Sequence, residues 1–345
     1  MEVASGIDAL YVSGHGTVSP SLLRALPAHR SAAEELGEPV PIDFGDGGWV
    51  VEPRGWLLYR YSLRHEHSRL GITDKLSIPA LRFQPLSEFL HAVGPAEALV
   101  WIQQQADEAA PKARLTGTRL DVYADWQGWP LGRDDLDRFV RRASAYKIHG
   151  SRADWTGFDF GRRKSGTVVA RIYDKTRQVS DEGKDWWYGV WADRYDGKTP
   201  VLRLEFEVGR QGLKEFGLDA ATDVLAGGPG IWAALTDKWL TLRTPSDDHT
   251  RSRWPLAPEW EQVQAASFRA NAIGLDRIRK GRNAGSLRTM TPGLVGYLAK
   301  AGALLGTQTL EDTLELLHEH VWAYGDRRGV TFEDRLRDKA RGLAA

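Results

Sequence analysis

The sequence predicts an α+β protein whose core is an antiparallel sheet built from two similar strand-helix-strand halves, followed by a helical C-terminal region. Two observations support this fold class. Several segments alternate apolar and polar residues, which is typical of half-buried antiparallel strands. The order strand, helix, strands, helix also occurs twice, so that 6–12 (GIDALYV) corresponds to 119–125 (RLDVYAD) and 56–64 (WLLYRYSLR) to 167–175 (TVVARIYDK).

The first half is expected to take residues 1–110. Its first strand covers 6–13, and Ser19 and Pro20 then start a helix, because serine caps a helix and proline suits its first turn. A glycine-rich turn at 45–48 precedes three strands and two helices. The strands are expected at 49–51, 56–65 and 80–83, and the helices at 87–93 and 97–106.

The second half, 111–230, is expected to begin in a polar segment that contains Pro111. A strand at 119–126 and a helix at 133–146 lead to a hairpin at 155–175. A strand at 201–208 and helical residues at 212–225 complete this half. The rest, 231–345, has a helical pattern, with helices at 291–305 and 309–324. In the second of these, Leu310, Leu314, Leu317 and Val321 predict an apolar stripe.

The composition limits the classes of function. The 345 residues include 46 basic and 46 acidic side chains and no cysteine. Balanced charge excludes a protein that coats nucleic acid through bulk positive charge, but not one with a local DNA-binding patch. The lack of cysteine excludes disulfides and thiolate metal sites. Neither a leader-like segment nor a long apolar run is apparent, so we expect a cytoplasmic protein without a membrane partner.

Three predicted strands of the second half carry ionisable residues on one face and apolar residues on the other. If the strands are neighbours, their charged faces form one surface. The plainest interpretation is a half-exposed sheet whose charges are solvated or pair across strands. The ionisable residues are Arg119, Asp121, Tyr123 and Asp125 in the first strand, Arg171, Tyr173 and Lys175 in the second, and Arg203, Glu205 and Glu207 in the third.

The hairpin favours a catalytic interpretation. Tyr173 lies between Arg171 and Lys175, which suits a nucleophile directed at a phosphate. Because tyrosine titrates near about 10 in water, we expect Arg171, Lys175 or a bound cation to lower its pKa. Clustered carboxylates predict a site for Mg²⁺ or Mn²⁺, which prefer oxygen ligands. The turn before Tyr173 is basic and contains Arg162, Arg163, Lys164 and Ser165.

Three segments together resemble the Rep_trans group of replication initiators, found on rolling-circle plasmids and certain phages. They are 119–125 (RLDVYAD), 160–175 (FGRRKSGTVVARIYDK) and 202–208 (LRLEFEV). The middle segment is the most specific, because its glycine, basic residues and serine stand at a fixed spacing from Arg-Ile-Tyr-Asp-Lys. The resemblance covers about residues 5–225 and implies a Rep nuclease-like fold.

The resemblance also implies a function. Tyr173 would cleave one strand of an origin and remain attached through a 5′-phosphotyrosine, leaving a 3′-hydroxyl that primes replication. The basic turn would hold the phosphate backbone. Expected partners are origin DNA, a second copy of the chain and a host helicase. The metal ligands implied are Asp121 and Glu205 first, then Asp125, Asp174 and Glu207.

Other interpretations stay open. A conjugative relaxase would use the same chemistry, and a regulator that binds DNA without cleaving it would keep the fold. His65-Glu66-His67 is similar to the histidine metal motif of larger relaxases, with Tyr146 as its tyrosine, although Glu66 is not apolar. The C-terminal helices suit a bundle or a helix-turn-helix. An aromatic cluster suits packing, a dimer contact or base stacking: Trp186, Trp187, Tyr188 and Trp191.

Overall fold

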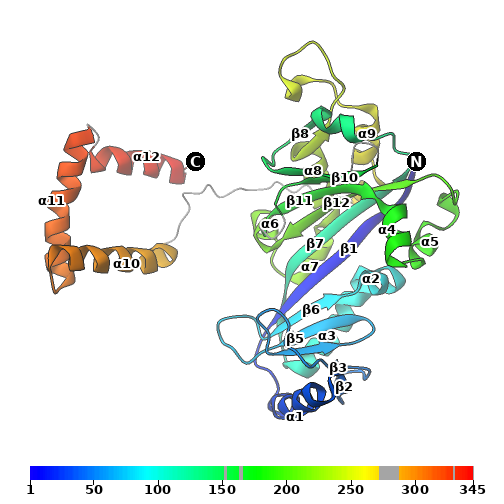
Figure 1. Cartoon of the computed structure of the whole chain (residues 1–345), viewed down its shortest axis with the longest axis horizontal. Coiled ribbons are helices and arrows are strands. Elements are labelled where there is room, and N and C mark those ends of the chain that lie inside the picture. The colour runs from blue at the N-terminus through cyan, green and yellow to red at the C-terminus, as the bar shows by residue number, and fades with distance from the viewer. Residues whose placement is uncertain (151–153, 163–165, 272–286, 329–330, 345) are drawn as a thin grey trace. The chain divides into compact units, whose positions relative to one another are not determined.

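The computed structural model describes residues 1–150, 154–162, 166–271, 287–328 and 331–344 (Figure 1). The chain divides into two compact units, Met1–Arg277 and Ile278–Ala345. No described helix is long and apolar enough to cross a bilayer. The mixture of a large antiparallel sheet with helices confirms the predicted α+β class.

An antiparallel sheet of eleven strands forms the centre of the large unit, in the order β2-β3-β4-β5-β6-β1-β7-β12-β11-β10-β9. The strands are β1 (Glu2–His15), β2 (Val40–Pro41), β3 (Val50–Val51), β4 (Tyr61–Arg64), β5 (Ser68–Ile72), β6 (Leu81–Pro85), β7 (Arg114–Gln127), β9 (Tyr146–Gly150), β10 (Trp155–Phe160), β11 (Val168–Asp174) and β12 (Val201–Gly209). A separate two-stranded sheet pairs β8 (Phe139–Arg141) with β13 (Leu240–Leu242).

The helices of the large unit are α1 (Pro20–Leu36), α2 (Ser87–Val93), α3 (Pro95–Ala109), α4 (Lys175–Glu182), α5 (Trp186–Trp191), α6 (Arg210–Glu215), α7 (Ala221–Ala226), α8 (Gly228–Lys238) and α9 (Pro258–Gln264). In the small unit, the described helices are α10 (Leu287–Leu305), α11 (Leu310–Arg328) and α12 (Phe332–Ala344).

The sheet is built around the seam between β1 and β7, its two longest strands (Figure 1). Outward from β1 lie β6, β5 and β4, and outward from β7 lie β12, β11 and β10. This arrangement supports two similar halves and places GIDALYV beside RLDVYAD. The predicted correspondence of 56–64 with 167–175 is shifted by one strand. Residues 168–174 form β11, which lies two strands out from β7, whereas residues 61–64 form β4, which lies three strands out from β1.

Alternation along β7 and β12 separates a core face from a polar face. Leu120, Val122 and Phe206 are buried on the core face, which α8 helps to cover. Trp232 of α8 lies 6.2 Å from Trp126 and 5.5 Å from Phe206, measured between ring centroids. The opposite face carries the charged residues of both strands. Burial on one side therefore fixes which side the charges occupy.

The predicted helix at 133–146 is wrong. Residues 133–138 form a short 3₁₀-helix, Phe139–Arg141 form β8, and Tyr146 begins β9. The buried Phe139 ring packs 5.0 Å from Phe160, and its strand pairs with β13. The helical spacing of apolar residues in this segment was a local signal, and long-range pairing with residues 240–242 overrode it.

Candidate functional site

The charged faces of β7, β12 and β11 form one surface, because these strands are neighbours in the sheet. Asp121 lies opposite Glu207, Glu205 lies opposite Arg171, and Arg203 lies opposite Tyr173. Sequence reasoning predicted this convergence from three segments that span almost 90 residues of the chain.

Tyr173 has a proton acceptor within hydrogen-bonding distance. Its hydroxyl donates to Glu205 Oε2 at 2.9 Å. Burial raises the pKa of Tyr173 well above its ordinary value, and the charge of Glu205 adds to this effect. Arg203 and Arg171 act in the opposite direction but are outweighed. Arg171 therefore lowers this pKa as expected, but burial and Glu205 raise it by more, and the phenol keeps its proton.

Two arginines share the carboxylates around Tyr173. Arg171 forms ion pairs with Glu205 and, at 3.8 Å, with Asp121. Arg119 donates from Nε to Asp121 at 2.7 Å and contacts Glu207 at 3.0 Å. Burial, together with the charge of Glu205, raises the pKa of Asp121 despite these arginines. The site therefore combines three neighbouring carboxyl groups with two arginine guanidinium groups.

The residues fit a divalent cation only in part. Among the described residues, no group of three or more histidine, aspartate or glutamate side chains is arranged to hold a metal. Asp121 and Glu205 do converge on one point, since both carboxylates contact Nη2 of Arg171. Two carboxylates around a position that already holds positive charge have the donor chemistry that Mg²⁺ and Mn²⁺ require.

Two other predicted ligands have structural partners. Asp125 is fully buried and pairs with Arg203, which donates from Nε at 2.7 Å and from Nη2 at 2.8 Å. Trp191 Nε1 also donates to Asp125, at 2.9 Å. Asp174 caps α4 by accepting a hydrogen bond from the backbone N–H of Arg177 at 2.9 Å. These contacts account for both carboxylates without a metal.

Lys175 is enclosed beside the candidate nucleophile. Only 3% of its surface is exposed, and its ammonium lies 4.4 Å from the ring centroid of Trp187. It donates to Gln178 at 2.8 Å. Burial, followed by the charge of Arg203, lowers the pKa of Lys175 from 10.5 to about 7. Trp187 and Trp191 are also buried, which favours packing over base stacking for this cluster.

A cavity of about 250 Å³ gathers Tyr173, Glu205 and Lys175 with residues that sequence reasoning missed. Asp8 of β1 is one of these residues: it accepts from Ser87 Oγ at 2.7 Å and lies 3.2 Å from Arg203. Burial alone would raise the pKa of Asp8, but the charges of Arg203 and Lys175 outweigh burial and lower it. The sequence did contain one indication of Asp8, because the correspondence of GIDALYV with RLDVYAD aligns Asp8 with Asp121.

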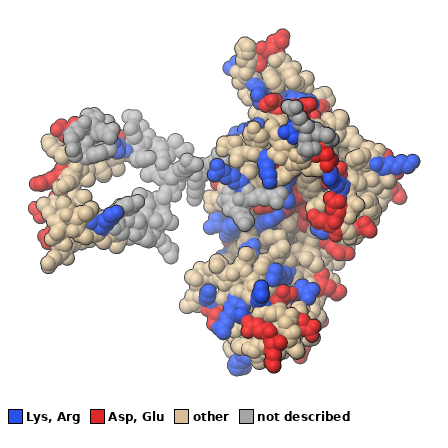
Figure 2. Space-filling view, viewed as in Figure 1, with Lys and Arg blue, Asp and Glu red and all other residues tan. Residues whose placement is uncertain are grey.

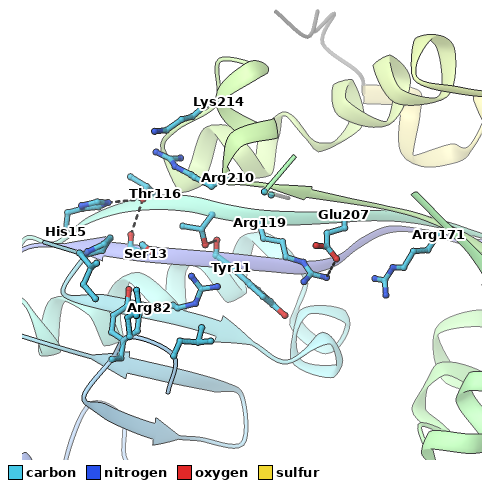
Figure 3. Close-up of a pocket in the computed structure, with 18 residues that line it drawn as sticks. Tyr11, Ser13, His15, Arg82, Thr116, Arg119, Arg171, Glu207, Arg210 and Lys214 are labelled. Carbon is cyan, nitrogen blue, oxygen red and sulfur yellow. Dashed lines mark hydrogen bonds and ion pairs between the residues drawn. The ribbon is translucent and has the colours of Figure 1, made fainter. Parts of the chain in front are cut away.

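A larger cleft of about 900 Å³ adjoins this cavity and shares Tyr11, Arg119 and Arg171 with it (Figure 3). Figure 2 shows Lys and Arg side chains concentrated near the middle of the visible face of the large unit. Of the predicted basic turn, Arg162 is exposed. Arg163, Lys164 and Ser165 lie outside the described residues.

The histidine alternative does not match the structure. His65 and His67 pack against aromatic rings, with His67 stacked 4.3 Å from Phe89 and His65 lying 5.1 Å from Trp49. Tyr146 is on β9, not on a helix, and eight positions separate β9 from β4 in the sheet. At about 4.8 Å per strand, these groups are roughly 38 Å apart across the sheet and cannot form one site.

Among solved structures, the chain is similar to one described as the rolling circle replication initiator protein from Geobacillus stearothermophilus. The similarity has a TM-score of 0.45 at 16% identity and covers 78% of this chain and 99% of that one. No protein-family profile matches the sequence. No curated protein matches it either.

Proposed function

We propose that this protein nicks and rejoins DNA through Tyr173 and thereby initiates rolling-circle replication of a plasmid or phage. The observation that carries the proposal is the hydrogen bond from Tyr173 to Glu205 Oε2, 2.9 Å long, beside Arg171. A nucleophile, a proton acceptor and a cation are then adjacent in one cavity. The three segments that resemble the Rep_trans initiators support the same chemistry.

Glu205 is the proposed general base. Because the pKa of Tyr173 is raised, its phenolic proton must leave as the oxygen attacks phosphorus. Glu205 would take that proton while a bond forms between Tyr173 Oη and phosphorus. The bond from phosphorus to the 3′-oxygen breaks, and the products are a 5′-phosphotyrosine and a 3′-hydroxyl protonated from solvent. Arg171 and Lys175 would stabilise the negative charge of the phosphate.

Asp121 and Glu205 are the proposed ligands of Mg²⁺ or Mn²⁺, with Glu207, which lies opposite Asp121 and shares Arg119 with it, as a further candidate. When bound, the ion would polarise the phosphodiester. Arg171 now contacts both proposed ligands, so metal binding would free its guanidinium for the phosphate. Asp125 and Asp174 are not among the proposed ligands, because both oxygens of Asp125 pair with the buried Arg203 and Asp174 caps α4.

Proposed partners follow from the reaction. Origin DNA would be the substrate, with the basic turn at 162–165 beside the cleaved phosphate. A second copy of the chain would complete the initiator, a host helicase would separate the strands, and the reaction would take place in the cytoplasm. Zero net charge predicts dependence on a particular site over salt-resistant binding to random DNA.

Nicking of a supercoiled plasmid that carries the native replicon tests the proposal. With Mg²⁺ or Mn²⁺, the wild type should give nicked circles and a covalent adduct at the 5′ end. Tyr173→Phe should abolish both products, because it removes the attacking oxygen. Tyr146→Phe is the matched control and should behave as the wild type, since Tyr146 lies on the exposed edge of the sheet.

The alternatives predict different results. If Tyr173→Phe nicks as well as the wild type, the assignment of the nucleophile is wrong. If the wild type binds the origin but never nicks it, the protein is a regulator. A relaxase would nick only a transfer origin.

A further inference from the structure

The 900 Å³ cleft reaches across the β1–β7 seam into the first half of the sheet, away from Tyr173. Its walls are strongly cationic. Arg82 enters from β6, whereas Arg210 and Lys214 enter from α6 on the other side (Figure 3). Arg119 and Arg171 connect the cleft to the Tyr173 cavity, and Glu207 is the one carboxylate among the lining residues. The described lining therefore carries an excess of positive charge.

Two of these cations are available to a ligand. In the described part of the chain, neither Arg82 nor Lys214 forms an ion pair with a carboxylate. Arg82 lies over Tyr11 and Trp56, 5.7 and 5.5 Å from their ring centroids, and its Nε is buried without a hydrogen-bond partner. Lys214 is exposed at the rim. A polyanion would supply the missing partners.

An apolar turn also lines the cleft. Trp56 and Tyr59 pair through two backbone hydrogen bonds, which leave Leu57 and Leu58 at the tip. These leucines are 72% and 67% exposed. Leu57 has a φ of 55°, a left-handed conformation that is strained for leucine. Two exposed leucines held on a strained turn are unusual for a surface that meets only water.

We propose that this cleft binds an unpaired flank of the cleaved DNA strand, with Leu57 and Leu58 contacting bases. The cations would follow the phosphates, and Tyr11, Tyr59 and the leucine turn would offer apolar surface to the bases. A duplex keeps its bases stacked inside and presents mainly phosphates, so it would leave the leucine turn unused. The first half of the sheet thus supplies substrate contacts for a nick made by the second half.

The proposal rests on the proposed nicking function but is tested by binding alone. Fluorescence anisotropy would compare the full-length wild type with variants, without divalent metal so that no strand is cleaved. The probes are a single-stranded oligonucleotide from the native replicon, with 2-aminopurine as a stacking reporter, and its duplex. The variants are the double change Leu57→Ser and Leu58→Ser, then Arg82→Ala and Lys214→Ala, with Arg24→Ala on α1 as an exposed control.

The leucine pair should weaken single-strand binding about 10-fold and abolish the 2-aminopurine signal, since serine removes the apolar surface on which the bases would rest. Its duplex binding should not change. Lys214→Ala should weaken binding and lower the salt slope by about 0.7, the value for one phosphate of a single strand. Because Lys214 is exposed, that variant is expected to fold even if Arg82→Ala does not.

Three results would overturn the proposal. The first is that the cleft variants bind the single strand as the wild type does. The second is that Arg24→Ala weakens single-strand binding equally, and the third is that the wild type binds only the duplex. If the wild type still nicks DNA in any of these cases, the proposed function is not contradicted and only the assignment of the cleft is wrong. If the wild type neither nicks nor binds DNA, both proposals are wrong.

Discussion

Tyr173 and Lys175 are only two residues apart, yet burial shifts their protonation in the same direction, towards the neutral form. A buried phenol keeps its proton and a buried ammonium loses its proton more easily, because low dielectric disfavours either charge. Cations near Tyr173 are thus insufficient to produce a phenolate. Glu205, in contact with the hydroxyl, becomes the decisive residue of the proposed site.

Glu205→Gln should reduce the nicking rate about 10²–10⁴-fold, the usual contribution of a general base. Glutamine can still accept the hydrogen bond of Tyr173, but it cannot take the proton and binds a metal ion more weakly, so the variant removes both roles proposed for Glu205. The rate is measured by single-turnover nicking of supercoiled DNA. Glu207→Gln is the control, and its loss should be much smaller. Equal losses in the two variants would argue against Glu205 as the base.

Lys175→Met should change the dependence of stability on pH. The lysine pKa falls from 10.5 in the unfolded chain to about 7 in the fold. Between these values the unfolded chain binds more protons, so this residue makes the wild type more stable as pH rises from 7 to 10.5. The full effect on the free energy of unfolding is on the order of 5 kcal/mol.

Urea unfolding at a series of pH values would measure this effect. In Lys175→Met, the rise in the free energy of unfolding between pH 7 and 10.5 should disappear, and the variant should be more stable than the wild type below pH 7. Lys184→Met is the control, because that lysine lines the same cavity but is 45% exposed and paired with Glu182. A constant difference between Lys175→Met and the wild type across the pH range would contradict the lowered pKa.

The end of β11 and the start of α4 hold the candidate nucleophile in place. Gly157 of β10 faces Tyr173 directly, and a Cβ at Gly157 would approach the Ile172 carbonyl oxygen to 2.2 Å. The glycine therefore permits β10 to lie close to β11. Immediately after Tyr173, Asp174 ends the strand and caps the helix.

Asp174→Ala should cost about 1 kcal/mol of stability through loss of the helix cap, whereas Asp174→Ser should cost less, because serine also caps helices. Both are measured by chemical denaturation. Nicking by Asp174→Ser should remain close to that of the wild type. A strong loss of nicking in this well-folded variant would show that the carboxylate is a metal ligand after all.

The two units of the molecule differ in how well their apolar residues are covered. The large unit buries an extensive core, whereas the predicted apolar stripe of α11 is largely exposed at Leu310, Leu314 and Val321. Trp322 is 72% exposed. Within the described part of the small unit nothing covers these apolar side chains, and the proposed second copy of the chain would supply a surface that does.

Sedimentation should therefore detect a species of twice the 38.5 kDa chain mass. Leu314→Lys and Trp322→Lys should convert it to the monomer, because each places a charge on the apolar face. Glu311→Lys on the same helix is the control and should remain dimeric. A wild type that is monomeric at every concentration would contradict the dimer and leave the nicking proposal untouched.

The sequence by itself determined the α+β class, the two halves and the charged faces of β7, β11 and β12. Each of these depends on local alternation, because burying one side of a strand decides which residues face the other side. The same alternation identified Tyr173, Asp121 and Glu205 as neighbours on one surface. What it could not determine is which neighbour each group contacts.

Only the tertiary structure decided which side chains of this surface pair with one another. Asp125 and Asp121 lie on the same face of β7 and both are buried, but Asp125 pairs with Arg203 whereas Asp121 lines the cavity. Segments remote in sequence made that difference: α5 covers one end of the face, and β1 brings Asp8 and Tyr11 beside it. The contacts and pKa values of these groups depend on desolvation and on charges far away in the chain, and neither has a local sequence pattern.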